Sequence, residues 1–267
     1  MIVGGDWGGA YMKLCTQQRI ETFPSDIIPY SEIRVENDLR EHDFIFEYNG
    51  RKGMAGTLAQ DEKTSLDSNR RGDTKYHEDA LIRLLIAIHQ YVPMQRVNVV
   101  VGQPIVRHNK EKKQIKEMLE GTHTITVNKI RKTIVIENAA VGAEGASAFY
   151  SNPKEGTVHL VDVGSGTINF ATIRNNRFVN SQSDTIPRGL ENIGYDLEAV
   201  ANSIKNKAVD LEWSPNVYLL GGGATQLSPY MPEYELFDPV YNGDIYASEF
   251  ANAVGFYKVG EMLWGRN

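Results

Sequence analysis

The sequence contains a single cysteine, Cys15, in 267 residues. One cysteine cannot form an internal disulfide, so we expect the reducing compartment of the cytoplasm. Long apolar runs are also lacking: the longest apolar helix candidate, residues 81–88, contains Arg83 and is far too short to span a bilayer. The N-terminus has no basic stretch followed by an apolar core, so we expect no secretory signal. These absences predict a soluble, intracellular chain without a membrane partner.

An excess of positive charge is lacking as well, because 34 acidic residues outnumber 28 Lys and Arg and the formal net charge is −6. A protein that binds nucleic acid directly needs a basic surface to neutralise the phosphates. The pair Arg70-Arg71 is too short to form one, so no direct nucleic-acid binding is expected. The apolar fraction (41%) and the charged fraction (23%) are typical of a globular protein with one sizeable domain or two small ones.

What the sequence does contain is a tight, glycine-rich turn between two β-branched runs, in residues 158–173. The turn follows Asp162 and consists of Gly164, Ser165, Gly166 and Thr167. This pattern predicts a β-hairpin whose tip can approach another molecule closely, since glycine has no Cβ. Backbone N–H groups and hydroxyls at such a tip form an anion site, and the nearby Asp would hold a hydrated divalent cation. An ordinary hairpin with a glycine turn is the alternative.

The same arrangement occurs again at the N-terminus, in residues 2–13. Here Asp6 matches Asp162, and the turn consists of Gly8, Gly9 and Ala10. So long a period indicates two related halves, because solenoid repeats recur about every 20–50 residues. Two such hairpins facing each other would clamp one nucleotide between two lobes. Lys13 occurs only in the first copy and could reach a terminal phosphate, although a solvated lysine at a strand end is the alternative.

Between the two hairpins, strand and helix patterns alternate. Residues 61–73 are typical of a loop, and Asn49-Gly50 predicts a type I′ turn in a hairpin of residues 44–58. Apolar spacing predicts helices over residues 76–91 and 111–120, and strands over residues 96–101, 122–127 and 132–137. This βαβ alternation predicts a largely parallel sheet covered by helices.

Glu144 stands isolated among Ala and Gly in residues 140–146. No basic residue is near it in the sequence, and its small neighbours offer little solvated surface. Two interpretations remain open. The carboxylate could be an acid at a helix N-terminus, which the helix dipole favours, or it could face a water beside a γ-phosphate.

After the central hairpin, Pro187 is expected to begin a helix that runs to about residue 208. A strand over residues 217–220 then leads into Gly221, Gly222, Gly223 and Ala224. Three glycines after a buried strand suit backbone that packs under a flat ligand such as a nucleoside, with a plain flexible turn as the alternative. Residues 248–264 are expected to form a helix that packs Met262, among others, inward.

In this order the motifs resemble those of the actin, heat-shock chaperone and sugar-kinase superfamily. Within it, the chain is similar to bacterial actins of the plasmid-segregation type, the ParM and AlfA group. The motifs that carry the resemblance are the two Asp-x-Gly hairpins, the turn around Glu144, the loop of residues 220–224 and the helix segment of residues 250–255. The resemblance implies an α/β, actin-like (ribonuclease H-like) fold of two duplicated domains with a nucleotide cleft between them.

The resemblance also implies roles for single residues. Asp6 and Asp162 would hold Mg²⁺ largely through its waters, and Glu144 would position the water that attacks ATP or GTP. The two turns and Lys13 would bind the phosphates, and residues 221–224 would contact the nucleoside. Domain I would span residues 1–150, with a small lobe (IB) at about 20–79, and domain II residues 151–267, with the C-terminal helix packing back on domain I.

Three features depart from the usual pattern of the superfamily. Trp7 is bulky for the first turn, and Asn169 stands where an acid often follows the second motif. In addition, residues 173–217 leave no room for the small lobe (IIB) that most members insert there. AlfA-type proteins lack that lobe, so the short segment favours the AlfA type.

Three functions compete at this point. The first is a filament-forming ATPase or GTPase that moves plasmid DNA through a DNA-binding adaptor, with its own copies as partners in a homopolymer, expected to be two-stranded. The second is a small-molecule kinase of the same superfamily, similar to type III pantothenate kinases. The third is a nucleotide-binding scaffold that does not hydrolyse. Lys13 and Glu144 favour the first, since no acid is evident that could serve a kinase as the base for a substrate hydroxyl.

Overall fold

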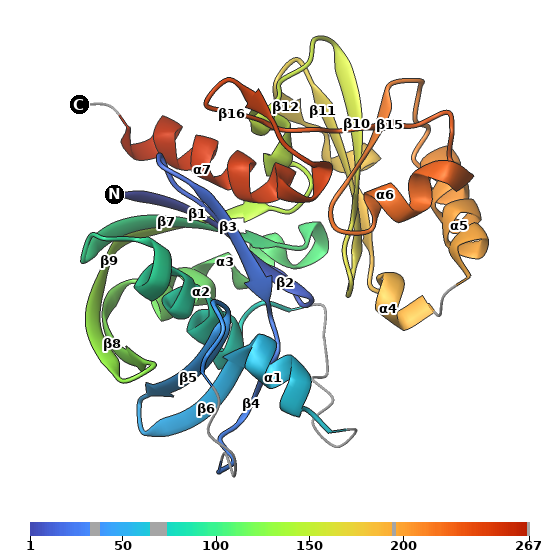
Figure 1. The fold of residues 1–267 in the computed structure, drawn as a ribbon. Helices are drawn as coiled ribbons and strands as arrows, with labels where there is room; N and C mark the ends of the chain where they lie inside the picture. The colour runs from blue at the N-terminus through green and yellow to red at the C-terminus, as the bar shows by residue number, and fades with distance from the viewer. Residues whose placement is uncertain (33–37, 65–73, 194–195, 266–267) are drawn as a thin grey trace.

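The computed structural model describes residues 1–32, 38–64, 74–193 and 196–265. Its described residues form two main sheets that lie beside each other, with the C-terminal helix α7 (Ala251–Trp264) against the first of them (Figure 1). The first sheet has the strand order β3-β2-β1-β7-β9-β8-β5-β6-β4. Its strands are β1 (Ile2–Trp7), β2 (Tyr11–Cys15), β3 (Ile20–Pro24), β4 (Ile27–Pro29), β5 (Asp43–Tyr48), β6 (Arg51–Gly56), β7 (Arg96–Gln103), β8 (Gly121–Val127) and β9 (Ile130–Ala143).

This first sheet is mixed, so the prediction of a largely parallel sheet is wrong. Among its described strands, only the pairs β1–β7 and β7–β9 are parallel. All other neighbouring strands in this sheet pair antiparallel, four of the pairs as hairpins of consecutive strands. The predicted type I′ turn between β5 and β6 is confirmed, because Asn49 and Gly50 both have positive φ, 50° and 78°. The second strand of that hairpin ends at Gly56, and the next residues form α1 (Thr57–Glu62).

Two helices cover opposite faces of the central strand β1. A Cβ on Gly5 would contact Leu84 of α2 (Glu78–Tyr91), whereas a Cβ on Gly4 would lie 2.4 Å from the carbonyl oxygen of Ala253 in α7. Because side chains alternate across a strand, α2 and α7 enclose this part of the sheet. The glycine at position 4 allows the backbone of α7 to lie directly on β1. The C-terminal helix therefore packs against strands from the beginning of the chain.

The two helices predicted between the hairpins form, with shifted ends. The side chain of His77 caps α2 by accepting a hydrogen bond from Ala80 N (3.1 Å). Helix α3 (Ile105–Leu119) begins directly after Pro104, six residues before the predicted start. Pro at a helix start costs no hydrogen bond, since the first N–H groups have no partner within the helix. No helix in the described part of the chain is long and apolar enough to cross a membrane.

The second sheet contains the central hairpin and the strand before the Gly-Gly-Gly loop. Its order is β12-β11-β10-β14-β15, with β13 paired to β11. These strands are β10 (Thr157–Val163), β11 (Ile168–Arg174), β12 (Arg177–Phe178), β13 (Asp184–Ile186), β14 (Val217–Leu220) and β15 (Glu235–Leu236). Around it lie α4 (Leu190–Ile193), α5 (Leu197–Asp210), α6 (Ala224–Leu227), the hairpin β16 (Val240–Tyr241) and β17 (Asp244–Ile245), and the 3₁₀ turns η2 (Ser147–Ser151), η3 (Asn180–Gln182), η4 (Ser228–Tyr230) and η5 (Ser248–Phe250).

The single helix predicted from Pro187 to about residue 208 is wrong. Pro187 lies in a bend, α4 is short, and α5 has its own cap, because the Asp196 side chain accepts a hydrogen bond from Ala199 N (2.9 Å). Gly189 explains why the helix begins later than predicted. Its Cα packs on the second hairpin turn, where a Cβ would lie 2.3 Å from the carbonyl carbon of Ser165. Residues 194–195 of the predicted helix lie outside the described residues.

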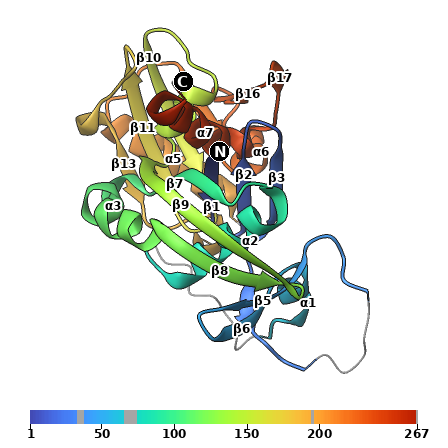
Figure 2. The same ribbon diagram turned by 90° about the vertical axis from the view of Figure 1, so that its left-hand side faces the viewer.

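The short segment between β11 and β14 agrees with the predicted absence of a small inserted lobe. Its described residues form β12, β13, α4, α5 and η3, and the two strands extend the second sheet instead of forming another one. At the other end of the molecule, β4, β5, β6 and α1 project away from α7 (Figure 2). These elements belong to the predicted IB lobe. Residues 65–73 of the predicted loop, with Arg70-Arg71, lie outside the described residues.

The C-terminal helix itself is confirmed, except for one inward residue. After η5, α7 runs to Trp264, with Ala253, Val254 and Tyr257 buried. Met262 was expected to pack inward, but its side chain is 52% exposed. The apolar spacing therefore overestimated how far along its length α7 is covered.

Candidate functional site

The turns of the two Asp-x-Gly hairpins have the same local geometry. A Cβ on Gly8 would lie 2.9 Å from the carbonyl oxygen of Tyr11, and a Cβ on Gly164 would lie 2.9 Å from that of Thr167. Only glycine avoids this clash. Because glycine has no Cβ, the backbone of each turn can approach a group bound at its tip closely. One turn belongs to the first sheet and the other to the second.

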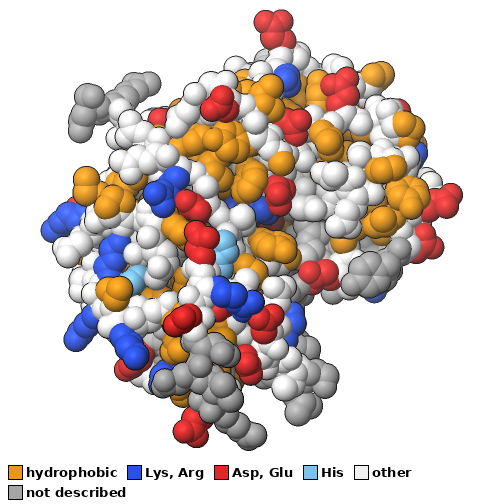
Figure 3. All heavy atoms as spheres, viewed as in Figure 1, with side chains coloured by type: hydrophobic (Ala, Val, Ile, Leu, Met, Phe, Trp, Pro, Cys, Tyr) orange, Lys and Arg blue, Asp and Glu red, His pale blue; other side chains and the backbone are white. Residues whose placement is uncertain are grey.

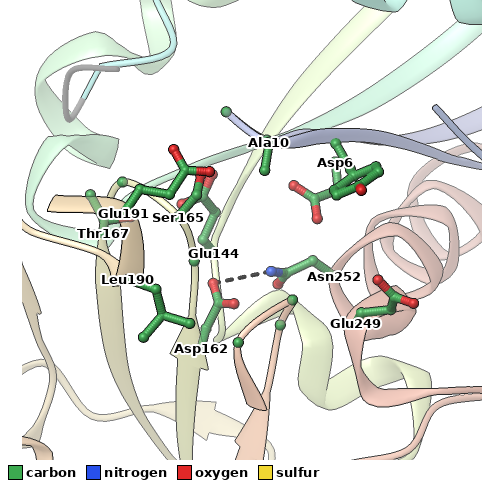
Figure 4. A pocket seen from close by; sticks show the side chains of 18 of the residues that line it. Asp6, Ala10, Glu144, Asp162, Ser165, Thr167, Leu190, Glu191, Glu249 and Asn252 are labelled. Carbon is green, nitrogen blue, oxygen red and sulfur yellow. Dashed lines mark hydrogen bonds between the residues drawn. The ribbon is translucent and has the colours of Figure 1, made fainter. Parts of the chain in front are cut away.

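Both turns face one cavity of about 310 Å³ between the two sheets (Figure 4). Its lining includes almost every site residue predicted from the sequence: Asp6, Gly8, Gly9, Ala10, Lys13, Glu144, Asp162, Gly164, Ser165, Gly166, Thr167, Gly221, Gly222 and Gly223. Ala224 is the exception. It is the first residue of α6 and is fully buried in the core of the second sheet.

The Gly-Gly-Gly loop presents one open position to this cavity. A Cβ on Gly221, where φ is +89°, would lie 2.6 Å from Asp162 Oδ1, and one on Gly223 would lie 2.4 Å from Leu190 Cδ1. A Cβ on Gly222 would meet no atom within 4 Å. The outer glycines thus pack the loop against the second hairpin and α4, and the middle one lies beside free space. This arrangement leaves room for a flat group over the loop.

Lys13 is buried inside the site and paired with Asp6. The two residues are opposite each other in the β1–β2 ladder, so their side chains lie on the same face of the sheet. The distance from Lys13 Nζ to Asp6 Oδ2 is 3.7 Å, and both residues are buried. The interpretation of Lys13 as a solvated lysine at a strand end is therefore wrong. The pair places a cation and a carboxylate together in the cavity.

Asp162 is held by two side-chain amides. Asn252 of α7 and Asn169 of β11 both donate through Nδ2 to Asp162 Oδ2, at 3.1 and 3.3 Å, and the first bond is drawn in Figure 4. Burial raises the pKa of the Asp162 carboxyl to about 7, and the negative charges of Glu144 and Asp6 act in the same direction. A buried carboxylate next to two others favours a proton or a cation as its partner.

Glu144 follows the last residue of β9, and its N–H donates to the carbonyl of Gln103 (3.0 Å). Its side chain is buried beside the cavity, three residues before η2, so the interpretation as a helix N-terminal acid is wrong. Oε2 accepts a hydrogen bond from Asn169 Nδ2 (3.2 Å). Within the described residues, the buried Oε1 has no hydrogen-bond partner. A buried acceptor of this kind fits a bound water.

The charge of Glu144 depends on its neighbours. Burial raises the pKa of the carboxyl, the ammonium group of Lys75 opposes that rise, and the negative charge of Asp6 adds to it. Lys75 Nζ lies 3.6 Å from Oε1 of Glu144. The backbone N–H of Lys75 donates to Gln103 Oε1 (3.1 Å), which holds this part of the chain at the end of β7.

Sequence reasoning missed several residues that line the same cavity. Lys75 carried no motif signal, because it precedes α2 in a polar segment. Asn252 lies in the helix segment that resembles the superfamily, yet nothing in the sequence pairs it with Asp162. The other missed residues lining the cavity are Tyr11, Leu190, Glu191, Leu197, Gln226 and Glu249. Trp7 is not part of the site: its ring is buried, and its Nε1 donates to the carbonyl of Gly102 (2.7 Å).

The cavity has the donor types that suit a hydrated magnesium ion. Asp6 and Asp162 place carboxylate oxygens on its two sides, and Mg²⁺ prefers oxygen ligands and keeps several of its waters. Among the described residues, no group of three or more His, Cys, Asp or Glu side chains could hold a metal ion. Water and phosphate oxygens would therefore have to complete the coordination of an ion bound here.

The chain has an actin-like fold. It has two sheets, an Asp-x-Gly turn from each sheet faces the same cavity, and a Gly-Gly-Gly loop lies beside that cavity. The family profile for the N-terminal domain of actin-like proteins matches residues 4–146, and the chain belongs to this family. No curated protein sequence matches the chain significantly.

Solved structures of AlfA, ParM and an archaeal actin homologue are similar to nearly the whole chain. An AlfA filament bound to AMPPNP superposes with a TM-score of 0.77 at 19% identity, covering 99% of this chain and 96% of that one. A 15-stranded ParM filament from Clostridium botulinum has a TM-score of 0.80 at 21% identity, covering 98% and 99%. An archaeal actin homologue, Ta0583, has a TM-score of 0.75 at 18% identity, covering 98% and 99%. At this identity the likeness shows the fold.

Proposed function

We propose that this chain is a nucleotide-dependent, filament-forming actin-like protein that hydrolyses ATP or GTP and moves plasmid DNA through a DNA-binding adaptor. One observation carries the proposal: both Asp-x-Gly turns, the Gly-Gly-Gly loop and Glu144 line one cavity, and Oε1 of Glu144 has no hydrogen-bond partner among the described residues. The similar AlfA structure is a filament bound to AMPPNP, an ATP analogue, which supports a nucleotide as the ligand and self-assembly as the state.

In this proposal the two turns bind the phosphates from opposite sides. Gly8, Gly9 and Ala10 in the first turn and residues 164–167 in the second offer backbone N–H groups, to which Ser165 and Thr167 add hydroxyls. Lys13 contributes a buried positive charge to balance the charge of the phosphates. Asp6 and Asp162 would hold Mg²⁺ through its waters, and the ion would neutralise phosphate charge during transfer. The nucleoside would lie over Gly222.

Glu144 acts on the attacking water. Its Oε2 is bound to Asn169, whereas Oε1 is free to accept a hydrogen bond from a water at the γ-phosphate. The carboxylate orients that water and takes its proton as the new P–O bond forms, and the nucleoside diphosphate leaves. The charge of Lys75 opposes the effect of burial on the pKa of Glu144 and so favours the ionised form, which a base requires. Such general-base assistance typically contributes ~10²–10⁴-fold to a rate.

The cavity lies between two domains, residues 1–150 and 151–267, in this proposal, and α7 joins them. Gly4 and Gly102 of the first domain accommodate Ala253 and Phe256 of α7, and Asn252 of the same helix donates to Asp162 of the second domain. With the IIB lobe missing, subunit contacts in a filament must come from the remaining lobes. Polymerisation would then complete the cleft and exclude bulk water near the γ-phosphate.

An adaptor is required because the chain offers little of its own for DNA. Its net charge is −6, and on the face shown in Figure 3 acidic and basic side chains of the described residues are interspersed. A surface of mixed sign does not neutralise a run of phosphates. We therefore assign contact with the plasmid to a separate DNA-binding protein that recognises the filament.

Sedimentation with ATP, with GTP and without nucleotide tests the proposal, combined with phosphate release over a range of protein concentrations. The chain should pellet only with a nucleotide and Mg²⁺, and phosphate release per chain should rise sharply above a critical concentration. Release strictly proportional to protein would show that the monomer already has a complete site. Nucleotide binding without pelleting or release would identify a non-hydrolysing scaffold instead.

A further inference from the structure

The side chain of Asn169 joins the two buried carboxylates of the site. Its Nδ2 lies 3.2 Å from Glu144 Oε2 and 3.3 Å from Asp162 Oδ2, and both bonds are buried. An amide NH₂ carries two protons, so one side chain can donate to both acceptors at once. An acid at this position would instead place a third carboxylate between the other two.

The opposite end of the same amide fixes its orientation. Asn169 Oδ1 accepts from the hydroxyl of Thr185 (2.8 Å) and from the backbone N–H of Ile105 (3.3 Å). A flipped amide would face Ile105 N–H with its own donors and turn Oδ1 toward two carboxylate oxygens. Both contacts would be repulsive, so only one orientation satisfies all four neighbours. The amide is thus held by α3 from one side and by β13 from the other.

In each of the two carboxylates, one oxygen accepts hydrogen bonds from side-chain amides and the other oxygen does not. Glu144 uses Oε2 for Asn169 and keeps Oε1 without a hydrogen-bond partner among the described residues. Asp162 uses Oδ2 for both Asn169 and Asn252. Asn252 differs from Asn169 in one respect, since its Oδ1 accepts from Gly145 N (3.0 Å) and its Nδ2 bonds only Asp162.

We propose that Asn169 is a positioning residue for hydrolysis, which orients Glu144 Oε1 toward the attacking water and couples Glu144 to the phosphate-binding carboxylate Asp162. This inference rests on the proposed nucleotide hydrolysis. Asn169 acts through Glu144 and does not itself touch the nucleotide. Its loss should therefore lower the rate of the chemical step, with a much smaller effect on nucleotide affinity.

A double-mutant cycle with Glu144 tests the coupling. Single-turnover phosphate release is measured for the unmodified chain, Asn169→Ala, Glu144→Gln and the double variant, together with Mg²⁺–nucleotide affinity and the melting temperature. Asn169→Ala should slow release about 10- to 100-fold, the range typical of residues that orient a functional group. In the Glu144→Gln background the same substitution should cost little more, since residues that act as one unit are not additive.

Two further variants separate positioning from folding. Asn252→Ala removes the other buried amide on Asp162, and it should weaken Mg²⁺–nucleotide affinity more than it slows release. Thr185→Val keeps the side-chain shape but removes the hydroxyl that orients the Asn169 amide, so it should slow release several-fold and still fold.

The inference can be overturned in several ways. Full additivity of Asn169→Ala and Glu144→Gln overturns it, as does release at the unmodified rate in both Asn169→Ala and Thr185→Val. If Asn169→Ala does not fold, Thr185→Val decides alone, since an unchanged rate there overturns the inference. An unmodified chain that binds nucleotide but never releases phosphate overturns the proposed hydrolysis, and the role of Asn169 with it. If the unmodified chain hydrolyses the nucleotide but the variants do not behave as expected, the role of Asn169 is overturned and the proposed hydrolysis stands.

Discussion

The ammonium nitrogen of Lys75 lies 3.6 Å from Oε1 of Glu144, and both side chains are largely buried in the cavity. This oxygen has no hydrogen-bond partner among the described residues. A cation at this distance favours the ionised carboxylate, against the effect of burial. The segment before α2 and the turn after β9, far apart in the sequence, thus share one electrostatic pair at the site.

We expect Lys75→Met to shift the pH dependence of hydrolysis. Methionine keeps an unbranched side chain of similar length and removes the charge. The pKa of Glu144 should then rise further, so the base form is lost at a higher pH and the acid limb of the rate profile moves upward. Single-turnover release between pH 6 and 9 measures this shift. Lys113→Met on the exposed face of α3 is the matched control, and a profile identical to that of the control would contradict the role of Lys75.

Glu144→Gln should slow hydrolysis by about 10²–10⁴-fold while nucleotide binding and pelleting persist. The amide keeps the shape of the side chain and its contact with Asn169, but it cannot take a proton from water. Phosphate release after rapid mixing with stoichiometric nucleotide gives the rate, and Glu117→Gln on the surface of α3 controls for the loss of charge. Release close to the unmodified rate would remove Glu144 from the mechanism.

The Asp162 carboxyl should lower the stability of the nucleotide-free chain as pH rises from about 5 to about 8. Its pKa of about 7 in the folded chain exceeds that of an unfolded Asp, so the folded state holds the extra proton. Protons bound to the folded state mean that its stability falls as pH rises through the folded pKa. His77 and His159 act in the opposite direction over the lower part of this range, because their pKa values of about 4 in the folded chain lie below that of an unfolded His.

Asp162→Asn should remove part of that pH dependence. Melting temperatures of both chains at about pH 5, 6.5 and 8 provide the measurement, and the difference between the chains isolates Asp162 from the other titrating groups. Relative to the variant, the unmodified chain should lose stability as pH rises over this range. Parallel curves would mean that the Asp162 carboxyl does not change its charge there.

Substitutions at Gly222 and Gly223 should have different effects, one on nucleotide affinity and the other on stability. Gly222→Leu should fold normally and lose nucleotide affinity, because its side chain would extend into free space of the cavity. Gly223→Ala should lower the melting temperature instead, because its Cβ would lie 2.4 Å from Leu190 Cδ1. Titration of a fluorescent nucleotide and thermal unfolding distinguish the two. Unchanged affinity in Gly222→Leu would place the nucleoside elsewhere.

Much of the site could be predicted because its parts are local in sequence. Each Asp-x-Gly turn needs glycine at the position where a Cβ would clash with the carbonyl oxygen three residues later. This requirement involves only a few consecutive residues, so it can be recognised in the sequence. The turn at Asn49-Gly50 follows the same logic, since both residues take positive φ. The order of these motifs along the chain was enough to predict the actin-like fold and the absence of an inserted lobe.

Local pattern could not predict the partners of these motifs. Helix periodicity continues through Pro187 and the following residues, but the close packing of Gly189 on the second turn prevents a single helix there. The first sheet is mixed because antiparallel strands flank its parallel strands on both sides. The direction of pairing depends on contacts between strands that are distant in sequence, such as β5 and β8.

The sequence by itself determined where the chain turns tightly and which residues line a cavity at those turns, because turn geometry and strand alternation are short-range properties. Only the tertiary structure decided the charge and orientation of the carboxylates. Lys75, Asn169 and Asn252 reach Glu144 and Asp162 from three separate elements. Burial and hydrogen bonding between such elements arise only when the two sheets and α7 come together, and no pattern along the chain records them.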